Sequence, residues 1–198
     1  MPEFSPPIFP FTGAILAGGR SSRMGRDKAF LTIDGQPLVT CQAARLREAG
    51  CAEVIISGRA GTDYGVAGAR VVHDSVRDAG PLAGLVAVLA AARHPWVLVL
   101  AVDLPRLDAA FLHRLLAFGG GRAGVAPHGP RGFEPLAALY PRALLPEAEA
   151  ALRRGELALS SLIENALRRA PLRPLALGAE DLPLFANWNS PDDVKPSL

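Results

Sequence analysis

The sequence contains only two cysteines, Cys41 and Cys51, among its 198 residues. They provide neither a disulfide framework nor the spacing of a metal site, so we expect a reducing, cytoplasmic setting. The apolar runs stay well short of the ~20 residues that a membrane-spanning helix needs. Residues 1–11 contain four prolines and lack the positively charged start of a secretory signal, so we expect a disordered, proline-rich arm.

The chain also lacks an excess of either charge. Its 21 lysines and arginines nearly balance 19 acidic residues, for a formal net charge of +2, and no run of five like charges occurs. This balance argues against nucleic acid or an anionic membrane as the partner. Basic side chains instead gather in one short stretch, from Arg20 to Lys28.

Apolar segments alternate with helical patterns along residues 12–198. This order predicts a single α/β domain with a Rossmann-like, mostly parallel sheet and helices on both faces. The expected strands lie at 14–16, 30–33, 54–56, 71–72, 96–102, 123–126, 134–140 and 171–177. The expected helices lie at 37–49, 81–92 and 107–118, with two more between 141 and 170.

The loop after the first predicted strand has the composition of a polyphosphate site. Residues 16–28, LAGGRSSRMGRDK, contain three glycines, two serines, three arginines and a lysine. Glycines let backbone N–H groups approach an anion, and cationic side chains neutralise it. A flexible basic surface loop is the alternative, because neither the P-loop pattern nor G-x-G-x-x-G is present.

The same loop resembles the signature LAGGxSxRMGxDK of the nucleotidyltransferases related to molybdenum cofactor guanylyltransferase. The resemblance extends from Thr12 to Asp193 and implies the fold of nucleotide-diphospho-sugar transferases. It further implies that backbone groups of the first four signature residues bind the nucleotide, namely Leu16, Ala17, Gly18 and Gly19. Arg23 and Lys28 would bind the phosphates and act in catalysis.

Asp103 directly follows the longest predicted strand. It could be a turn or helix-start residue. The segment AVDLP, however, resembles the magnesium-binding aspartate segment of the family, which makes Asp103 the expected metal ligand. Mg²⁺ is usually held by one or two carboxylates together with substrate phosphates and water. Parallel strands of such a sheet place their carboxyl ends at one edge, where ligands bind. Ser57, Asp74 and Asp103 should therefore meet the glycine-rich loop there.

Further segments match the family in order. Asp74 and Gly80 belong to a stretch similar to its D-x-x-x-x-x-G-P-L-A-G element, which implies contact with the nucleoside. Ser57 stands where the family often has asparagine at a nucleotide contact. Asn187 and Asn189 match its F-x-N-x-N ending, which implies a place at the active site. The segment 133–140 is similar to a strand of the acceptor half, although a plain edge strand is nearly as good a reading.

These resemblances together imply transfer of GMP from GTP to molybdenum-loaded molybdopterin, with release of pyrophosphate and with Mg²⁺ as cofactor. Molybdoenzyme apoproteins or their chaperones would be further partners. A cytidylyltransferase, or a nucleotidyltransferase for another phosphorylated acceptor, is the alternative in the same fold. Close relatives that use CTP tend to read LAAG with proline before the lysine, whereas this chain has Gly18 and Asp27. A GTP-binding or cofactor-delivery module is the non-enzymatic alternative.

Overall fold

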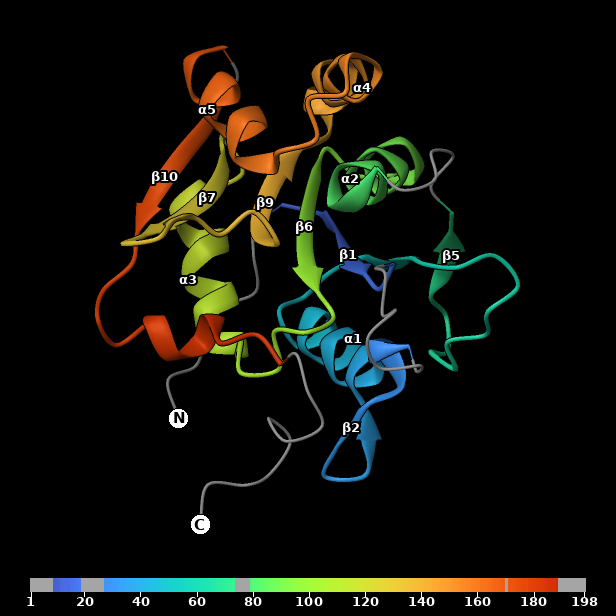
Figure 1. The fold of residues 1–198 in the computed structure, drawn as a ribbon. Helices are drawn as coiled ribbons and strands as arrows, with labels where there is room; N and C mark the ends of the chain where they lie inside the picture. The colour runs from blue at the N-terminus through green and yellow to red at the C-terminus, as the bar shows by residue number, and fades with distance from the viewer. Residues whose placement is uncertain (1–8, 19–26, 74–78, 170, 189–198) are drawn as a thin grey trace.

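The computed structural model describes residues 9–18, 27–73, 79–169 and 171–188 and shows an α/β fold around one mixed sheet (Figure 1). The sheet has eight strands in the order β10-β7-β9-β6-β1-β4-β5, with β8 beside β7. Their bounds are β1 Phe11–Leu16, β4 Glu53–Ser57, β5 Arg70–Val72, β6 Trp96–Ala101, β7 Gly124–Gly129, β8 Gly132–Phe133, β9 Ala137–Pro141 and β10 Leu172–Ala176. A separate hairpin pairs β2, Thr32–Ile33, with β3, Gln36–Pro37.

Helices cover both faces of this sheet, as the sequence predicts. They are α1 Leu38–Glu48, α2 Gly80–Ala91, α3 Ala109–Gly119, α4 Leu145–Arg154 and α5 Leu159–Arg169, with single 3₁₀ turns η1 Lys28–Phe30, η2 Arg142–Leu144 and η3 Leu182–Phe185. α1 and α3 pack on one face, together with Phe185 and Trp188, and α2, α4 and α5 pack on the other. Of the helices in the described ranges, none combines the length and hydropathy that spanning a bilayer requires.

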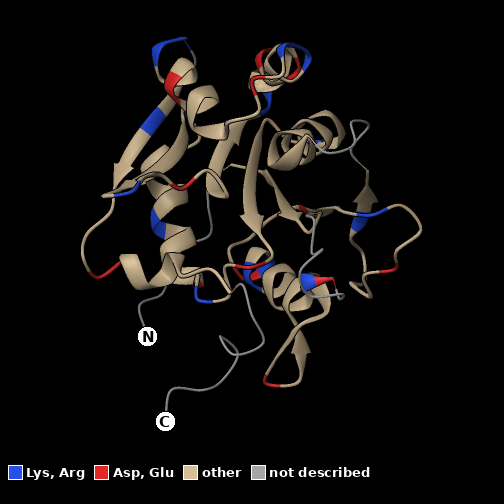
Figure 2. Cartoon of the chain, in the orientation of Figure 1, with Lys and Arg blue, Asp and Glu red and all other residues tan. Residues whose placement is uncertain are grey.

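β6 lies at the centre of the fold. All six of its residues are buried, and it runs parallel to β1 on one side and antiparallel to β9 on the other. Neither β1 nor β6 carries a charged side chain, and Figure 2 shows the charged residues on the surrounding loops and helices and on the outer strands β5 and β10. A strand covered on both faces needs apolar residues at every position, which is why Trp96–Ala101 shows no alternation.

The prediction of a mostly parallel sheet is confirmed, with β9 and the short β8 as the exceptions. β9 is antiparallel to both of its neighbours, β6 and β7. After β7 the chain turns back through β8, whose Gly132 pairs with Gly129, and no helix separates β7 from β9. A connection this short returns the chain antiparallel, because a parallel return needs a crossover of a dozen or more residues.

Several boundaries differ from those predicted: the strand expected at 134–140 is Ala137–Pro141, the helix expected at 107–118 is Ala109–Gly119, and two further differences have identifiable causes. Residues 30–33 were expected to form one strand, but Lys28–Phe30 is a 3₁₀ turn and only Thr32–Ile33 is extended. The Asp27 side chain causes this, since it accepts a hydrogen bond from the Ala29 amide at 3.1 Å and caps the turn. The expected arm also extended to residue 11, but Phe11 is fully buried in β1, and the ring of Phe9 packs against Trp96. Residues 1–8 of the expected arm lie outside the described residues.

Candidate active site

The carboxyl ends of β1, β4 and β6 meet at one edge of the sheet. The backbone amides of Ala17 and Gly18 donate hydrogen bonds to the Ser57 carbonyl, at 2.8 and 3.1 Å. On the other side of β1, the Val102 amide donates to the Leu16 carbonyl at 3.2 Å. The chain thus brings residues 16–18, the end of β4 and the residue before Asp103 together, as the sequence analysis predicts.

Lys28 and Asp103 form an ion pair at this edge although they lie 75 residues apart in sequence. The Lys28 Nζ atom is 2.9 Å from the Asp103 Oδ2 atom, and each side chain is 23% exposed. Both groups are therefore shielded from most of the solvent but still accessible. The lysine expected to bind phosphate is therefore in direct contact with the aspartate expected to bind the metal.

The backbone around Lys28 is fixed by its neighbours. Ala29 is fully buried, and the Leu31 and Phe30 amides close the turn on Lys28 and Asp27. The second carboxylate oxygen of Asp27, Oδ2, lies 3.8 Å from Arg59 Nε and has no hydrogen bond to any described residue. Asp27 thus caps the start of η1 and fixes the position of Lys28. Its carboxylate faces the guanidinium of Arg59, from the loop after β4.

Two segments hold the backbone around Asp103. The fully buried Gln42 of α1 donates through Nε2 to the carbonyls of Ala101 and Leu104, at 3.1 and 2.8 Å. From the other end of the chain, the Trp188 amide donates to the Asp103 carbonyl at 3.0 Å. Gln42 was not predicted as a site residue. A buried amide inside a helix is its only signal, and burial is not visible in the sequence.

Ser57 is buried against the glycine-rich start of α2. A Cβ atom added to Gly84 would lie 3.2 Å from Ser57 Oγ and 3.4 Å from Leu16 Cδ2, so only glycine gives this close approach without displacement. Gly80 begins α2 with a φ of 63°, a conformation that favours glycine. The G-P-L-A-G element therefore packs on the strand edge.

The remaining predicted residues divide into two groups. Asn187 is exposed and precedes Trp188, so its backbone lies beside Asp103. Gly19, Arg23, Asp74 and Asn189 lie outside the described residues.

The residues at this edge suit a hard divalent cation. Within the described ranges, no group of three or more histidine, cysteine or acidic side chains lies close enough to enclose a metal ion. The Asp103 carboxylate instead offers an accessible oxygen ligand that already pairs with a cationic group, the Lys28 ammonium. A single carboxylate is sufficient where substrate phosphates and water supply the other ligands, as is usual for Mg²⁺.

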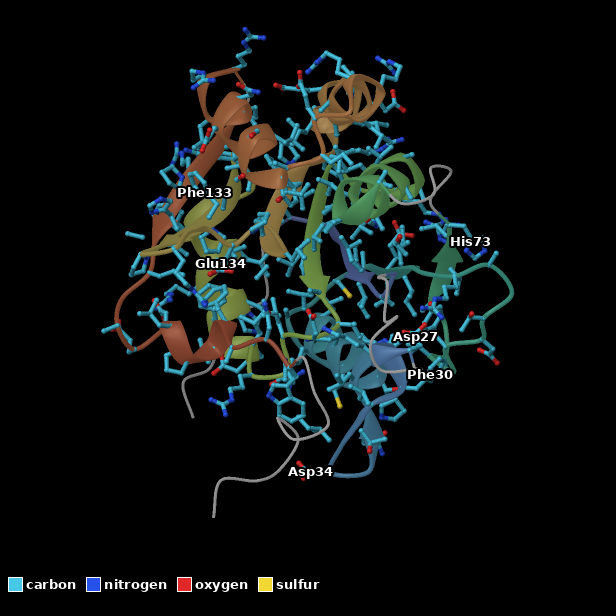
Figure 3. All side chains as sticks on the ribbon, in the orientation of Figure 1. Asp27, Phe30, Asp34, His73, Phe133 and Glu134 are labelled. Atoms are coloured by element: carbon cyan, nitrogen blue, oxygen red, sulfur yellow. The ribbon has the colours of Figure 1, made fainter. Side chains whose placement is uncertain are left out.

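A second group of side chains lies on the other side of β6. Figure 3 shows Phe133 and Glu134 there, whereas Asp27 and Phe30 lie near α1 and His73 lies beside β5. Burial raises the pKa of Glu134 above its usual value, and the Arg131 guanidinium opposes this effect. The Tyr140 hydroxyl, fully buried, donates to the Pro135 carbonyl at 2.8 Å, and burial raises its pKa as well.

Comparisons with known proteins agree with this geometry. The family model of the MobA-like NTP transferase domain matches residues 13–171. A probable molybdenum cofactor guanylyltransferase of Opitutus terrae is 45% identical over 185 residues, which cover 91% of each chain.

Solved structures share the fold. The molybdopterin-guanine dinucleotide biosynthesis protein A of Archaeoglobus fulgidus has a TM-score of 0.68 at 24% identity, covering 92% of this chain and 94% of that one. A Mycobacterium tuberculosis protein in complex with manganese has a TM-score of 0.60 at 22% identity, covering 85% and 88%. The strand edge, the sequence match and the shared fold agree, and the chain belongs to the MobA-like NTP transferase family.

Proposed function

We propose that this protein is a molybdenum cofactor guanylyltransferase. It transfers GMP from GTP to molybdenum-loaded molybdopterin and releases pyrophosphate. The near full-length similarity to the Opitutus terrae relative supports this function. The observation that carries it is the contact of Lys28 with Asp103 at the carboxyl edge of β6, because it places a cation suited to phosphate beside a carboxylate suited to Mg²⁺.

The reaction is an in-line displacement at phosphorus. An oxygen of the terminal phosphate of the acceptor attacks the α-phosphorus of GTP, and the bond to pyrophosphate breaks. Such a step needs positioning and charge neutralisation rather than a protein nucleophile. Lys28 and Arg23 bind the phosphates and stabilise the charge that grows on the leaving pyrophosphate. Asp103 holds Mg²⁺, which neutralises the triphosphate when it is bound.

The nucleotide lies along the end of β1 in this proposal. The amides of Ala17 and Gly18 donate to the Ser57 carbonyl, which fixes the start of the glycine-rich loop against the end of β4. Ser57, Asp74 and Gly80 contact the nucleoside, and Asn187 and Asn189 complete the site from the C-terminal segment.

The proposed reaction also indicates the cellular compartment and the protein partners. Cys41 and Cys51 are both free thiols, which suits a reducing, cytoplasmic compartment. The finished cofactor must then pass to an apoprotein, so we expect molybdoenzymes or their chaperones as partners.

The test is a selectivity assay on the purified protein with Mg²⁺ and molybdenum-loaded molybdopterin. GTP, CTP and ATP are supplied in turn, and pyrophosphate and the dinucleotide product are measured. We expect turnover with GTP at least tenfold faster than with CTP. Faster turnover with CTP would identify a cytidylyltransferase, and GTP binding without any turnover would identify a binding or delivery module.

A further inference from the structure

A cavity of about 590 Å³ lies between the β8 hairpin, the first turns of α5 and the start of α2. Its volume falls in the range of small-molecule sites. Phe133 comes from the hairpin, Ser160 and Glu164 from α5, and Pro81 from α2. No residue of the cavity belongs to the Lys28 and Asp103 pair.

The cavity is connected to the nucleotide edge in two ways. One wall residue, Leu136, accepts a hydrogen bond through its carbonyl from the Ala101 amide at 2.8 Å, two residues before Asp103. Another, Pro81, lies one helical turn before Gly84, which packs on Ser57. A ligand in the cavity would therefore lie beside the strand edge without occupying it.

One wall of the cavity is aromatic. The rings of Phe133 and His128 pack edge to face, with centroids 4.6 Å apart. Pro135, next along the wall, is anchored by the hydrogen bond that its carbonyl accepts from Tyr140. An aromatic wall of this kind suits a flat heteroaromatic ring.

The opposite wall carries a carboxylate. Ser160 and Glu164 lie four residues apart on α5, so they project from the same face and line the cavity beside the buried Leu159, whereas Ile163 faces the core. Among the described residues, Glu164 has no ion pair or side-chain hydrogen bond. An ionised carboxylate only accepts hydrogen bonds, so its ligand must offer N–H or O–H donors.

We propose that this cavity binds the pterin ring system of the acceptor, and that Glu164 recognises its amino-pyrimidinone edge. A pterin presents two adjacent donors, the 2-amino group and N3–H, which match the two oxygens of one carboxylate. Phe133 contacts the face of the ring. The inference rests on the proposed function, since it takes molybdopterin as the acceptor, and it adds the residue that selects the pterin.

Equilibrium dialysis with two free heterocycles tests the selection directly. Pterin and lumazine are compared in the presence of saturating GTP and Mg²⁺, because lumazine carries an oxygen in place of the 2-amino group. We expect the wild-type protein to bind pterin at least tenfold more tightly than lumazine, since an unmatched oxygen would face the carboxylate. The Glu164→Gln variant should reduce this preference to threefold or less.

The Glu149→Gln variant is the matched control, because Glu149 lies on α4 and does not line the cavity. It should keep the wild-type preference. An undiminished preference in Glu164→Gln, or no preference or no saturable pterin binding in the wild type, would overturn the inference.

Turnover separates this inference from the proposed function. With molybdopterin as acceptor, Glu164→Gln should raise the KM for the acceptor about tenfold or more and leave kcat and the KM for GTP within twofold. An unchanged acceptor KM contradicts the role of Glu164 while the guanylyltransferase activity stands. A wild-type protein that forms no dinucleotide from GTP contradicts the proposed function instead, whatever the dialysis shows.

Discussion

The buried side chain of Gln42 donates a hydrogen bond to the carbonyl of Leu104, the residue directly after Asp103. The same nitrogen also reaches the carbonyl of Ala101, so α1 holds the backbone on both sides of the carboxylate. The position of the expected metal ligand is therefore determined by a helix that takes no part in the chemistry.

Replacing Gln42 tests this positioning role. We expect Gln42→Leu to lower the free energy of unfolding by about 2 kcal/mol, because two buried carbonyls lose their donor. We also expect kcat to fall about tenfold with little change in the KM for GTP. Urea unfolding and steady-state kinetics provide the two measurements. An unchanged kcat beside a lowered stability would reduce Gln42 to a purely structural residue.

Removing the Lys28 ammonium should have opposite effects on metal binding and on catalysis. In Lys28→Met, the Asp103 carboxylate loses its partner at 2.9 Å, so Mn²⁺ should bind the nucleotide-free protein several-fold more tightly. GTP turnover should fall at least 100-fold, because the phosphates lose a cation. Metal titration followed by electron paramagnetic resonance measures the first effect, and Asp103→Asn, which should lose both metal binding and turnover while remaining folded, is the control.

A methyl group at Gly18 tests the nucleotide preference. A Cβ atom there would meet nothing nearer than the Ser57 carbonyl, at 3.9 Å, so Gly18→Ala should change the free energy of unfolding by no more than about 0.5 kcal/mol. If a purine needs the space beside Gly18, the ratio of kcat/KM for GTP to that for CTP should fall. Competition between the two nucleotides measures this ratio, and an unaltered ratio would remove Gly18 from the account of base selection.

The acid stability of the fold should depend on Glu53. Burial alone would raise the pKa of this carboxyl group, but hydrogen bonds from the Arg93 amide, Arg70 and Thr12 outweigh burial and lower it. A lowered pKa in the folded state stabilises the fold above the unfolded value of about 4.3, and the contribution is lost as the pH falls through the folded pKa. Glu53→Gln should thus cost about 2 kcal/mol at pH 7 and progressively less below pH ~4.

Urea unfolding across this pH range measures the difference between Glu53→Gln and the wild type. Glu156→Gln is the control, because Glu156 pairs with Arg154 at the exposed surface, and its removal should leave the unfolding curve unchanged at either pH. A wild-type advantage over Glu53→Gln that grows toward low pH would contradict the sign of the argument.

Local patterns were sufficient to predict most of the fold. The strand expected at 96–102 is β6, and the helix expected at 107–118 is α3, which Asp108 caps by accepting from the Phe111 amide at 2.8 Å. The direction of β9 could not be predicted in this way, because it depends on the pairing of Gly129 with Gly132 rather than on the composition of the strand.

The candidate site likewise contains residues that the sequence could predict and residues that it could not. Strand ends predicted that Gly18, Ser57 and Asp103 would meet, since the edge they share follows from parallel pairing alone. The contact between Lys28 and Asp103 and the support from Gln42 depend on how η1 and α1 pack on the sheet, and pattern reasoning does not reach that packing. For the same reason, Glu164 gave no signal in the sequence.

The hydrogen bond from Trp188 to the Asp103 carbonyl also bears on biosynthesis. All the described strands precede Trp188 in the chain, so the sheet leaves the ribosome before this residue does. The backbone that holds the expected metal ligand therefore gains this support only after the strands of the sheet have been synthesised. A nascent chain that has already formed much of its sheet still lacks this contact beside Asp103 until Trp188 has emerged.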